Sequence, residues 1–381
     1  MKATFIQSLD DVDAAAWNAL VPAGNPFLAH EFLAAMEHSG SVGVESGWAP
    51  SHVLAHDDHG ALVGALPLYE KAHSWGEFVF DFAWAQAFHR SGLHYYPKLV
   101  SAIPFTPATG PRLMAAGQRR DVMDFLVEAS IAQAREHGLS SLHLLFGDDD
   151  TLASAGRHGL MPRLDCQFHW TNEGYADFDA FLATFRSARR KKLKRERRRV
   201  KECGIGFRWI NGDALTDDLL HRIYPFYERT FLMRGNSPYL NRAFFEEIRE
   251  TMPEALAIAL AEIQGEAVAT AICFQGADAL YGRYWGAGAD YHSLHFETCF
   301  YQGIEYAIRH ELDRFEPGAQ GEHKLRRGFR PTRTYSTHWV GHPEFGRAID
   351  DYLRRERNAV EAYIEDADAE LPFRRPDFAL T

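Results

Sequence analysis

The segment Phe315–Phe329, FEPGAQGEHKLRRGF, contains the residue types that acid–base chemistry and anion binding need. It follows an apolar stretch typical of a strand, and its three glycines allow tight turns or close approach of the backbone to a ligand. A general base, a general acid and several cations lie within this one loop, at Glu316, Glu322, His323, Lys324, Arg326 and Arg327. The sequence therefore predicts a functional loop, with a solvated charged loop as the alternative.

The composition indicates a globular protein with two domains. The chain has 381 residues, of which 46% are hydrophobic and 24% charged, and each half is long enough to bury its own core. The N-terminal segment becomes acidic where a signal peptide would become apolar. The longest apolar run, Ala255–Ala261, is far shorter than the roughly 20 residues of a membrane span. We expect a soluble, cytoplasmic protein.

The cysteines and histidines form no metal-binding motif. No C-x-x-C pair occurs, so we expect reduced structural thiols at Cys166, Cys203, Cys273 and Cys299. His52, His56 and His59 flank a turn between two apolar stretches, where we expect no zinc site. The chain also has no G-x-G-x-x-G and no Walker sequence, so nothing indicates a tightly bound nucleotide cofactor.

Positive charge is concentrated in one segment. Arg186–Lys201, RSARRKKLKRERRRVK, has eleven Lys or Arg and one Glu, a charge of +10 in a chain of net charge −11. An apolar stripe precedes and enters it, so Asp177–Cys203 is predicted to form a helix or a helix pair that ends at Gly204. Such a helix can bind nucleic acid phosphates, an anionic membrane or a nucleotide-bearing substrate, or it can be a solvated connector.

The chain contains two copies of one pattern. Each copy begins with a loop that enters a helix, continues with a hairpin that turns at Gly60 or Gly265, and ends with a helix followed by a strand. The matching segments are Gly24–Met36 with Gly235–Ile248, His52–Leu68 with Ala257–Cys273, and Leu126–Leu142 with Cys299–Phe315. We therefore predict a duplicated α/β unit: residues 1–170, a basic helical connector over 171–205, residues 206–345, and a C-terminal helix and tail over 346–381.

Each copy has a candidate anion site at a helix entrance. In the second copy, the aromatic strand Leu280–Gly288 precedes a predicted helix over Ser293–His310, in which Ser293 caps the N-terminus and Glu297 lies in the first turn. In the first copy, Thr109–Arg112 lies ahead of a helix. Ser293 and Arg112 are the predicted donor-binding positions, with a surface loop as the alternative at Arg112.

The order of elements resembles the GNAT acyltransferase fold in tandem. Phe181–Ile210, FLATFRSARRKKLKRERRRVKECGIGFRWI, is similar to a basic helix and strand of the FemABX-type aminoacyl transferases, and Leu325–Phe329, LRRGF, to their Phe-Lys-x-Gly-Phe element. YWGAGADYHSLHFETCFYQGIEYAI together with FEPGAQGEHKLRRGFRPT resembles the FemAB-like peptidoglycan biosynthesis/recognition family in particular. The resemblance implies an α/β (α+β) fold with two tandem GNAT-like domains and mixed sheets.

The resemblance also implies an N-acyltransferase. Acyl-CoA or aminoacyl-tRNA would be the donor, with no tightly bound cofactor, and an amine would be the acceptor, with a peptidoglycan precursor as one candidate. Arg326 stands at the lysine position of the family element, and arginine cannot shuttle a proton. Proton transfer would then fall to Glu297, Glu316, Glu322 or His323.

The mechanistic hypothesis gives each remaining residue a role. Glu316 or Glu297 takes the proton of the acceptor amine, with His323 as the competing base. The predicted substrate-binding set is Tyr284, Trp285, Glu322, Lys324, Arg326 and Arg327. The alternatives are a core role for the aromatics and a helix-dipole role for Glu297. A second hypothesis is a non-catalytic module that recognises RNA or a cell-wall precursor through the basic helix and the 316–329 loop.

Overall fold

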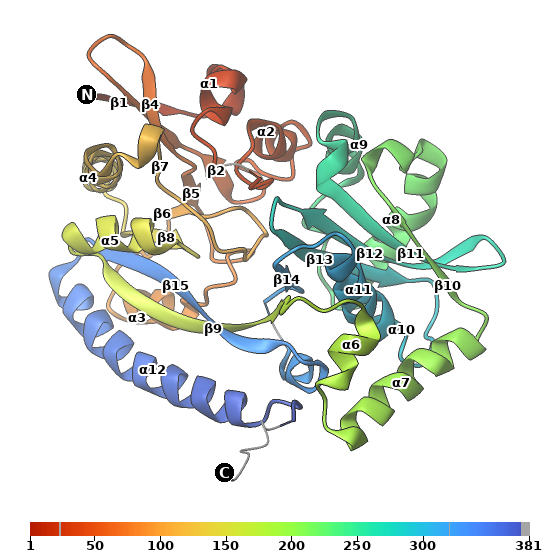
Figure 1. Cartoon of the computed structure of the whole chain (residues 1–381). Helices are drawn as coiled ribbons and strands as arrows, with labels where there is room; N and C mark the ends of the chain where they lie inside the picture. Colours follow the sequence, from red (N-terminus) through yellow and green to blue (C-terminus); the bar gives the residue numbers. More distant parts are fainter. Residues whose placement is uncertain (23, 320, 375–381) are drawn as a thin grey trace. The chain divides into compact units, whose positions relative to one another are not determined.

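The computed structural model describes residues 1–22, 24–319 and 321–374 and divides into two compact units (Figure 1). Unit 1 consists of residues 1–166, 239–247 and 333–362, and unit 2 of residues 167–238, 248–332 and 363–381. Two strands, β9 (Met161–Thr171) and β15 (Arg330–Val340), therefore begin in one unit and end in the other. The domain boundaries expected from the sequence stay a prediction.

Unit 1 contains two sheets. The first has the order β1-β3-β4-β7, and the second includes β15-β8-β6-β5-β2. The strands other than β15 are β1 (Lys2–Ile6), β2 (Trp48–Pro50), β3 (His52–His56), β4 (Leu62–Leu66), β5 (Tyr69–Lys71), β6 (Lys98–Ser101), β7 (Met114–Ala115) and β8 (Ser141–Leu145). The helices are α1 (Ala14–Asn18), α2 (His30–His38), α3 (Phe82–Arg90), α4 (Arg120–Glu136) and α5 (Asp149–Arg157), with most of α9 (Arg242–Thr251) and α12 (Pro343–Ala369). Leu66, Val122 and Leu126 belong to the core between the first sheet and α4.

Unit 2 contains a sheet with the order β10-β11-β12-β13-β14-β9. Besides β9, its strands are β10 (Gly206–Ile210), β11 (Leu256–Ile263), β12 (Glu266–Gln275), β13 (Ala279–Ala287) and β14 (Arg314–Glu316). Its helices are α6 (Phe178–Ala183), α7 (Ser187–Glu202), α8 (Asp217–Leu232), α10 (Leu294–Phe296) and α11 (Gln302–Arg309), with a π-helical turn over Glu297–Tyr301 between α10 and α11. Helix α8 packs against β12 and β13, and α11 packs against β13 and β14.

The predicted duplication is visible in the strand pairing. The hairpins β3–β4 and β11–β12 are antiparallel, and Gly60 and Gly265 both turn the chain with a φ of +84°, a conformation that glycine adopts without strain. Strand β6 then pairs parallel with β8, as β13 does with β14. Strand β15 pairs antiparallel with β8, and β9 with β14. The same order of pairing therefore occurs in each unit.

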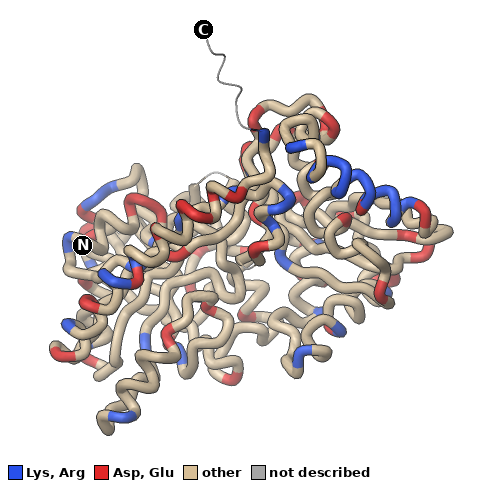
Figure 2. The backbone as a smooth tube through the Cα atoms, turned by 90° about the horizontal axis from the view of Figure 1, so that it is seen from below, with Lys and Arg blue, Asp and Glu red and all other residues tan. Residues whose placement is uncertain are grey.

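The basic segment forms the predicted helix pair. Asp177 caps α6 by accepting a hydrogen bond from the Ala180 backbone, and α7 ends before Gly204, whose φ is +73°. Leu193 and Val200 are buried on α7, and Val200 lies in a core cluster of unit 2 with residues of β11 and β12. Figure 2 shows Lys and Arg along most of the remaining length of this helix. One side of α7 is thus packed and the other presents cations to solvent.

Within the described ranges, none of the helices combines the length and apolar character that crossing a membrane requires.

Candidate functional site

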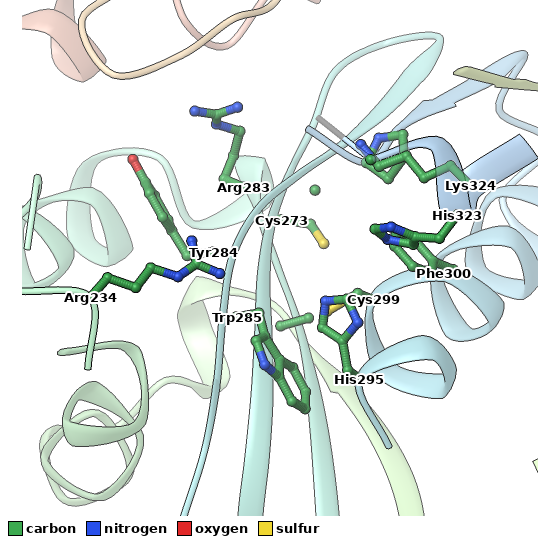
Figure 3. Close-up of a pocket in the computed structure, with 14 residues that line it drawn as sticks. Arg234, Cys273, Arg283, Tyr284, Trp285, His295, Cys299, Phe300, His323 and Lys324 are labelled. Carbon is green, nitrogen blue, oxygen red and sulfur yellow. The ribbon is translucent and has the colours of Figure 1, made fainter. Parts of the chain in front are cut away.

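A pocket of about 410 Å³ opens in unit 2 where two parallel strands stop pairing. Strands β13 and β14 pair over three residues, and the last pair is Tyr281 with Glu316. Beyond that point the pocket begins, with Gly282 on one strand and Pro317 after the other. Its lining comes from β12, β13, the helical segment 294–301, the 3₁₀ turn Glu322–Arg327, the loop after α8 and the segment between β14 and that turn. The lining residues are Arg234, Ala271, Cys273, Gly282, Arg283, Tyr284, Trp285, His295, Cys299, Phe300, Pro317, Gly321, His323 and Lys324 (Figure 3).

Lys324 is the buried amine of this pocket. It is 2% exposed, and its Nζ donates a hydrogen bond of 2.5 Å to the Gly318 carbonyl oxygen. Burial lowers the pKa of Lys324 to about 7, because the charged form is poorly solvated there. Near neutral pH a large fraction of this amine is therefore uncharged and able to accept a proton.

Apart from the arginines, the histidines and cysteines of the pocket are mostly neutral at pH 7. Burial lowers the pKa of His295 to about 4, and burial together with nearby cations lowers the pKa of His323. Burial raises the pKa of the Cys273 thiol to about 12 and that of Cys299 well above its usual value. Both cysteines are therefore thiols, as expected, and neither is activated as a nucleophile.

Two of the proposed bases lie outside this pocket lining. Glu297, in the π-helical turn, is buried and accepts hydrogen bonds from Arg197 at 3.0–3.1 Å and from Gln302 at 2.8 Å. Burial raises the pKa of Glu297, and the Arg197 guanidinium opposes that effect. Glu316, at the end of β14, is also buried and accepts a hydrogen bond of 3.0 Å from Arg314. Their roles as bases stay predictions.

Arg327, one of the two arginines of the loop, makes several contacts inside the protein. Arg327 is buried and donates to Glu196 at 3.1 Å, to Tyr301 at 3.1 Å and to the His323 carbonyl at 2.9 Å. Its guanidinium also lies 3.4 Å from the centre of the Phe296 ring. These internal contacts give Arg327 a structural role within unit 2.

A second hollow lies beside the pocket. It has a volume of about 380 Å³, and its lining includes Glu322, Arg326, Tyr363, Asp366, Ala367 and Glu370. The Tyr363 hydroxyl donates to Glu322 at 3.1 Å. His323 lines both the pocket and this hollow, so the predicted loop residues His323 and Lys324 reach the pocket, whereas Glu322 and Arg326 reach the hollow.

Tyr284 and Trp285, which the sequence predicted to bind substrate, both line the pocket. Trp285 lies edge-on to His295, with ring centroids 5.3 Å apart. Tyr284 is buried, and its ring contacts Tyr227 of α8 at 4.9 Å between centroids. Tyr284 therefore contributes to the packing between β13 and α8 as well as to the pocket.

The two predicted donor-binding residues make internal contacts. Arg112, in unit 1, is 1% exposed and donates to the carbonyl oxygens of Ala108, Gly110 and Leu145 at 2.6, 3.3 and 2.7 Å. The prediction that Ser293 caps a helix is wrong. Ser293 has a φ of +67° and makes no capping bond, and its hydroxyl instead lies 2.7 Å from Nδ1 of His292. The single helix predicted over 293–310 is divided by the π-helical turn.

Several pocket residues were not predicted from the sequence. Arg283 and Arg234 supply cations, and His295, Cys273 and Cys299 complete the lining. Arg283 carried one local signal, since it is a charged residue within the otherwise apolar and aromatic strand LYGRYWGAG. Arg234 lies in the loop after α8, far from β13 in sequence, and no local pattern marks it.

Comparison with solved structures shows the fold. FemX matches with a TM-score of 0.54 and 11% identity, over 92% of this chain and 100% of that chain. The C-terminal domain of a protein described as a lysylphosphatidylglycerol synthetase of Agrobacterium fabrum matches with a TM-score of 0.53 and 10% identity. That match covers 93% of this chain and 98% of the other. L-PGS from Bacillus licheniformis matches with a TM-score of 0.50 and 9% identity, over 90% of this chain and 98% of the other. The predicted fold of tandem GNAT-like units with mixed sheets is confirmed.

Comparison of sequences identifies the family. None of the curated proteins matched the chain. The profile of the FemAB-like family, described as peptidoglycan biosynthesis/recognition, matches residues 8–375. The predicted family is therefore confirmed, and with it the acyltransferase class of enzyme. The chain belongs to the FemAB-like family.

Proposed function

We propose that unit 2 transfers an aminoacyl or acyl group from aminoacyl-tRNA or acyl-CoA to an amine, with a peptidoglycan precursor as the acceptor. The observation that carries the proposal is Lys324, a buried amine that lines the pocket and whose pKa burial lowers to about 7. A group with a pKa near the working pH is best suited to accept a proton in the transition state. The family description supports the cell-wall acceptor.

In the proposed reaction the acceptor nitrogen attacks the donor carbonyl carbon. A C–N bond forms and the ester or thioester bond breaks. The leaving group is the hydroxyl oxygen of the tRNA or the sulfur of CoA. Neutral Lys324 takes the proton that the acceptor nitrogen loses and can return it to the leaving group. His323, which lines the same pocket, is the competing base.

The test is a transfer assay with labelled donors. Purified protein is incubated with aminoacyl-tRNA or acyl-CoA and with a UDP-linked peptidoglycan precursor, and the labelled amide is measured. Lys324→Met should lower kcat by about 100- to 10,000-fold, the usual contribution of a general base. The matched control is Lys2→Met, because Lys2 is an exposed lysine of β1 in unit 1, outside both the pocket lining and α7. The absence of transfer from both donor classes would overturn the proposal.

A second candidate function, recognition of RNA, is favoured by the exposed face of α7. Its exposed cations include Lys191, Lys192 and Arg195, and a helix with this charge attracts phosphates in a salt-dependent way. Arg197 is a poor choice for mutation because it binds Glu297 inside unit 2. Neutralising Lys191, Lys192 and Arg195 together should reduce the steepness with which tRNA affinity falls as salt rises. An unchanged salt dependence would exclude this face as the binding surface.

A further inference from the structure

We propose that the pocket binds an anionic oxygen group of a substrate, a phosphate or a carboxylate, and that Arg283 and Arg234 hold it. This inference rests on the proposed function, because it names the chemistry that the same pocket recognises. It concerns arginines that lie outside the loop Phe315–Phe329.

The charge of the pocket lining favours an anion. The lining residues that the structure describes include two arginines, one lysine and two histidines, and no Asp or Glu. With both histidines neutral and Lys324 partly neutral at pH 7, the arginines carry most of the positive charge. Burial lowers the pKa of Arg283, and Tyr284 and the Glu316 carboxylate oppose that effect only in part. An anion bound in the pocket would stabilise the charge of Arg283.

The two arginines lie apart from one cluster of rings, that of His295, Phe300 and His323, whereas the Tyr284 ring lies 5.6 Å from the Arg283 guanidinium. Figure 3 shows Arg283 and Arg234 toward one side of the pocket and His295, Phe300 and His323 toward the other. The rings pack on one another, with centroids 5.4 Å apart for His295 and Phe300 and 5.5 Å apart for Phe300 and His323. A ligand can therefore place its anionic end on the arginines and a planar or apolar part against the rings.

The chemistry of the two arginines matches a phosphate or a carboxylate. A guanidinium offers a planar fork of N–H donors that fits two oxygens at once, which a lysine ammonium does not. The volume of about 410 Å³ is within the range of small-molecule sites, roughly 300–1,000 Å³. Lys324 lines the same pocket, so an anion held on the arginines would fix the substrate relative to this amine.

The contacts of Arg327 support this assignment. Arg327 was predicted to bind substrate together with Arg326, and its guanidinium binds Glu196, Tyr301 and the His323 carbonyl. Arg326 lines the neighbouring hollow. The arginines that line the pocket next to Lys324 come from β13 and from the loop after α8.

Calorimetric titration tests the proposal with two anions. Inorganic pyrophosphate serves as the phosphate probe and N-acetylglycine as the carboxylate probe, both at constant ionic strength because exposed cations attract any anion at low salt. Binding of at least one probe is expected, and Arg234→Gln and Arg283→Met should each weaken it about tenfold or more, as expected for a charge-assisted hydrogen bond. Arg309→Gln, at an exposed position at the end of α11, is the matched control and should bind as the wild type does.

Each outcome has a defined meaning. Pyrophosphate binding alone assigns the pocket to a phosphate-bearing substrate, and N-acetylglycine binding alone to a carboxylate-bearing one. If neither probe binds, or if Arg234→Gln and Arg283→Met bind as tightly as the wild type, the proposal is overturned, because any binding then occurs elsewhere, such as on α7. Arg234 is exposed, so its substitution keeps the test valid even if Arg283→Met does not fold.

The outcome is independent of the transfer assay. If both arginine variants bind the probes weakly while the wild type transfers no acyl group, the anion site stands and the proposed function fails. If the wild type transfers an acyl group and both variants keep its KM and kcat, the proposed function stands and the anion site fails.

Discussion

Glu196 of α7 and Arg327 of the loop form an ion pair of 3.1 Å, and both side chains are less than 10% exposed. The next residue of the helix, Arg197, binds Glu297 of the π-helical turn. Two consecutive residues on the inner side of the basic helix thus hold the two segments that follow β13 and β14. The helix predicted as a connector or a binding surface is also part of the scaffold of the pocket.

The first prediction concerns the stability of this ion pair. Glu196→Gln should lower the free energy of unfolding by about 3 kcal/mol, because breaking a buried pair leaves Arg327 as a buried charge without its carboxylate. Chemical denaturation measures the change. Arg198→Gln, an exposed residue of the same helix, is the control and should change the value by less than about 0.5 kcal/mol. Equal stabilities of the two variants would show that the pair contributes nothing.

The second prediction concerns the pH dependence of transfer. Burial lowers the pKa of Lys324 from 10.5 to about 7, so its proton-accepting form is scarce below pH 7 and predominates above it. The rate constant kcat/KM should therefore rise about tenfold per pH unit below that value and level off above it. The measurement is a pH–rate profile of the wild type and of Lys324→Met. A variant that retains the same rising limb would assign the profile to another group, with His323 as the first candidate.

Local patterns in the sequence predict much of this fold. Gly60 and Gly265 each turn a hairpin between two apolar stretches, and both signals lie within a few residues of the structure that they determine. The helix pair before Gly204 is visible in the same way. These elements depend on short-range spacing and on glycines at turns. A single sequence shows both the spacing and the glycines directly.

The site depends on contacts that no local pattern displays. Glu297 looks like a base at a helix start, but its partner Arg197 is a hundred residues away in the chain. Lys324 looks like one solvated cation among several, and only tertiary packing buries it. Ser293 has a residue type suited to capping, yet its backbone is left-handed and its side chain makes no capping bond. Partner choice and burial therefore decide which of the loop's charges line the pocket.

The third prediction separates the structural and catalytic roles of the two carboxylates. Glu297→Gln should lower the free energy of unfolding by about 1–3 kcal/mol, because it weakens a charge-assisted interaction with Arg197, and Glu316→Gln should do the same through Arg314. If Lys324 is the base, kcat should fall far less in either variant than in Lys324→Met. A loss of kcat of about 100-fold or more at unchanged stability would identify that carboxylate as the base instead. Denaturation and transfer are measured on the same preparations.

The fourth prediction concerns Gly286, where β13 meets α8. A Cβ added at Gly286 would lie 2.0 Å from the backbone oxygen of Phe226, so Gly286→Ala requires the helix and the strand to move apart. Overpacking of this kind typically costs about 1–3 kcal/mol of unfolding free energy. Gly206→Ala on β10 is the matched control, because nothing lies within 4 Å of the added carbon there. Thermal or chemical denaturation of both variants gives the comparison.

A Gly286→Ala protein as stable as the control would mean that α8 and β13 are not in close contact. The lining of the pocket by Arg283 and by Arg234, which follows α8, would then be in doubt as well.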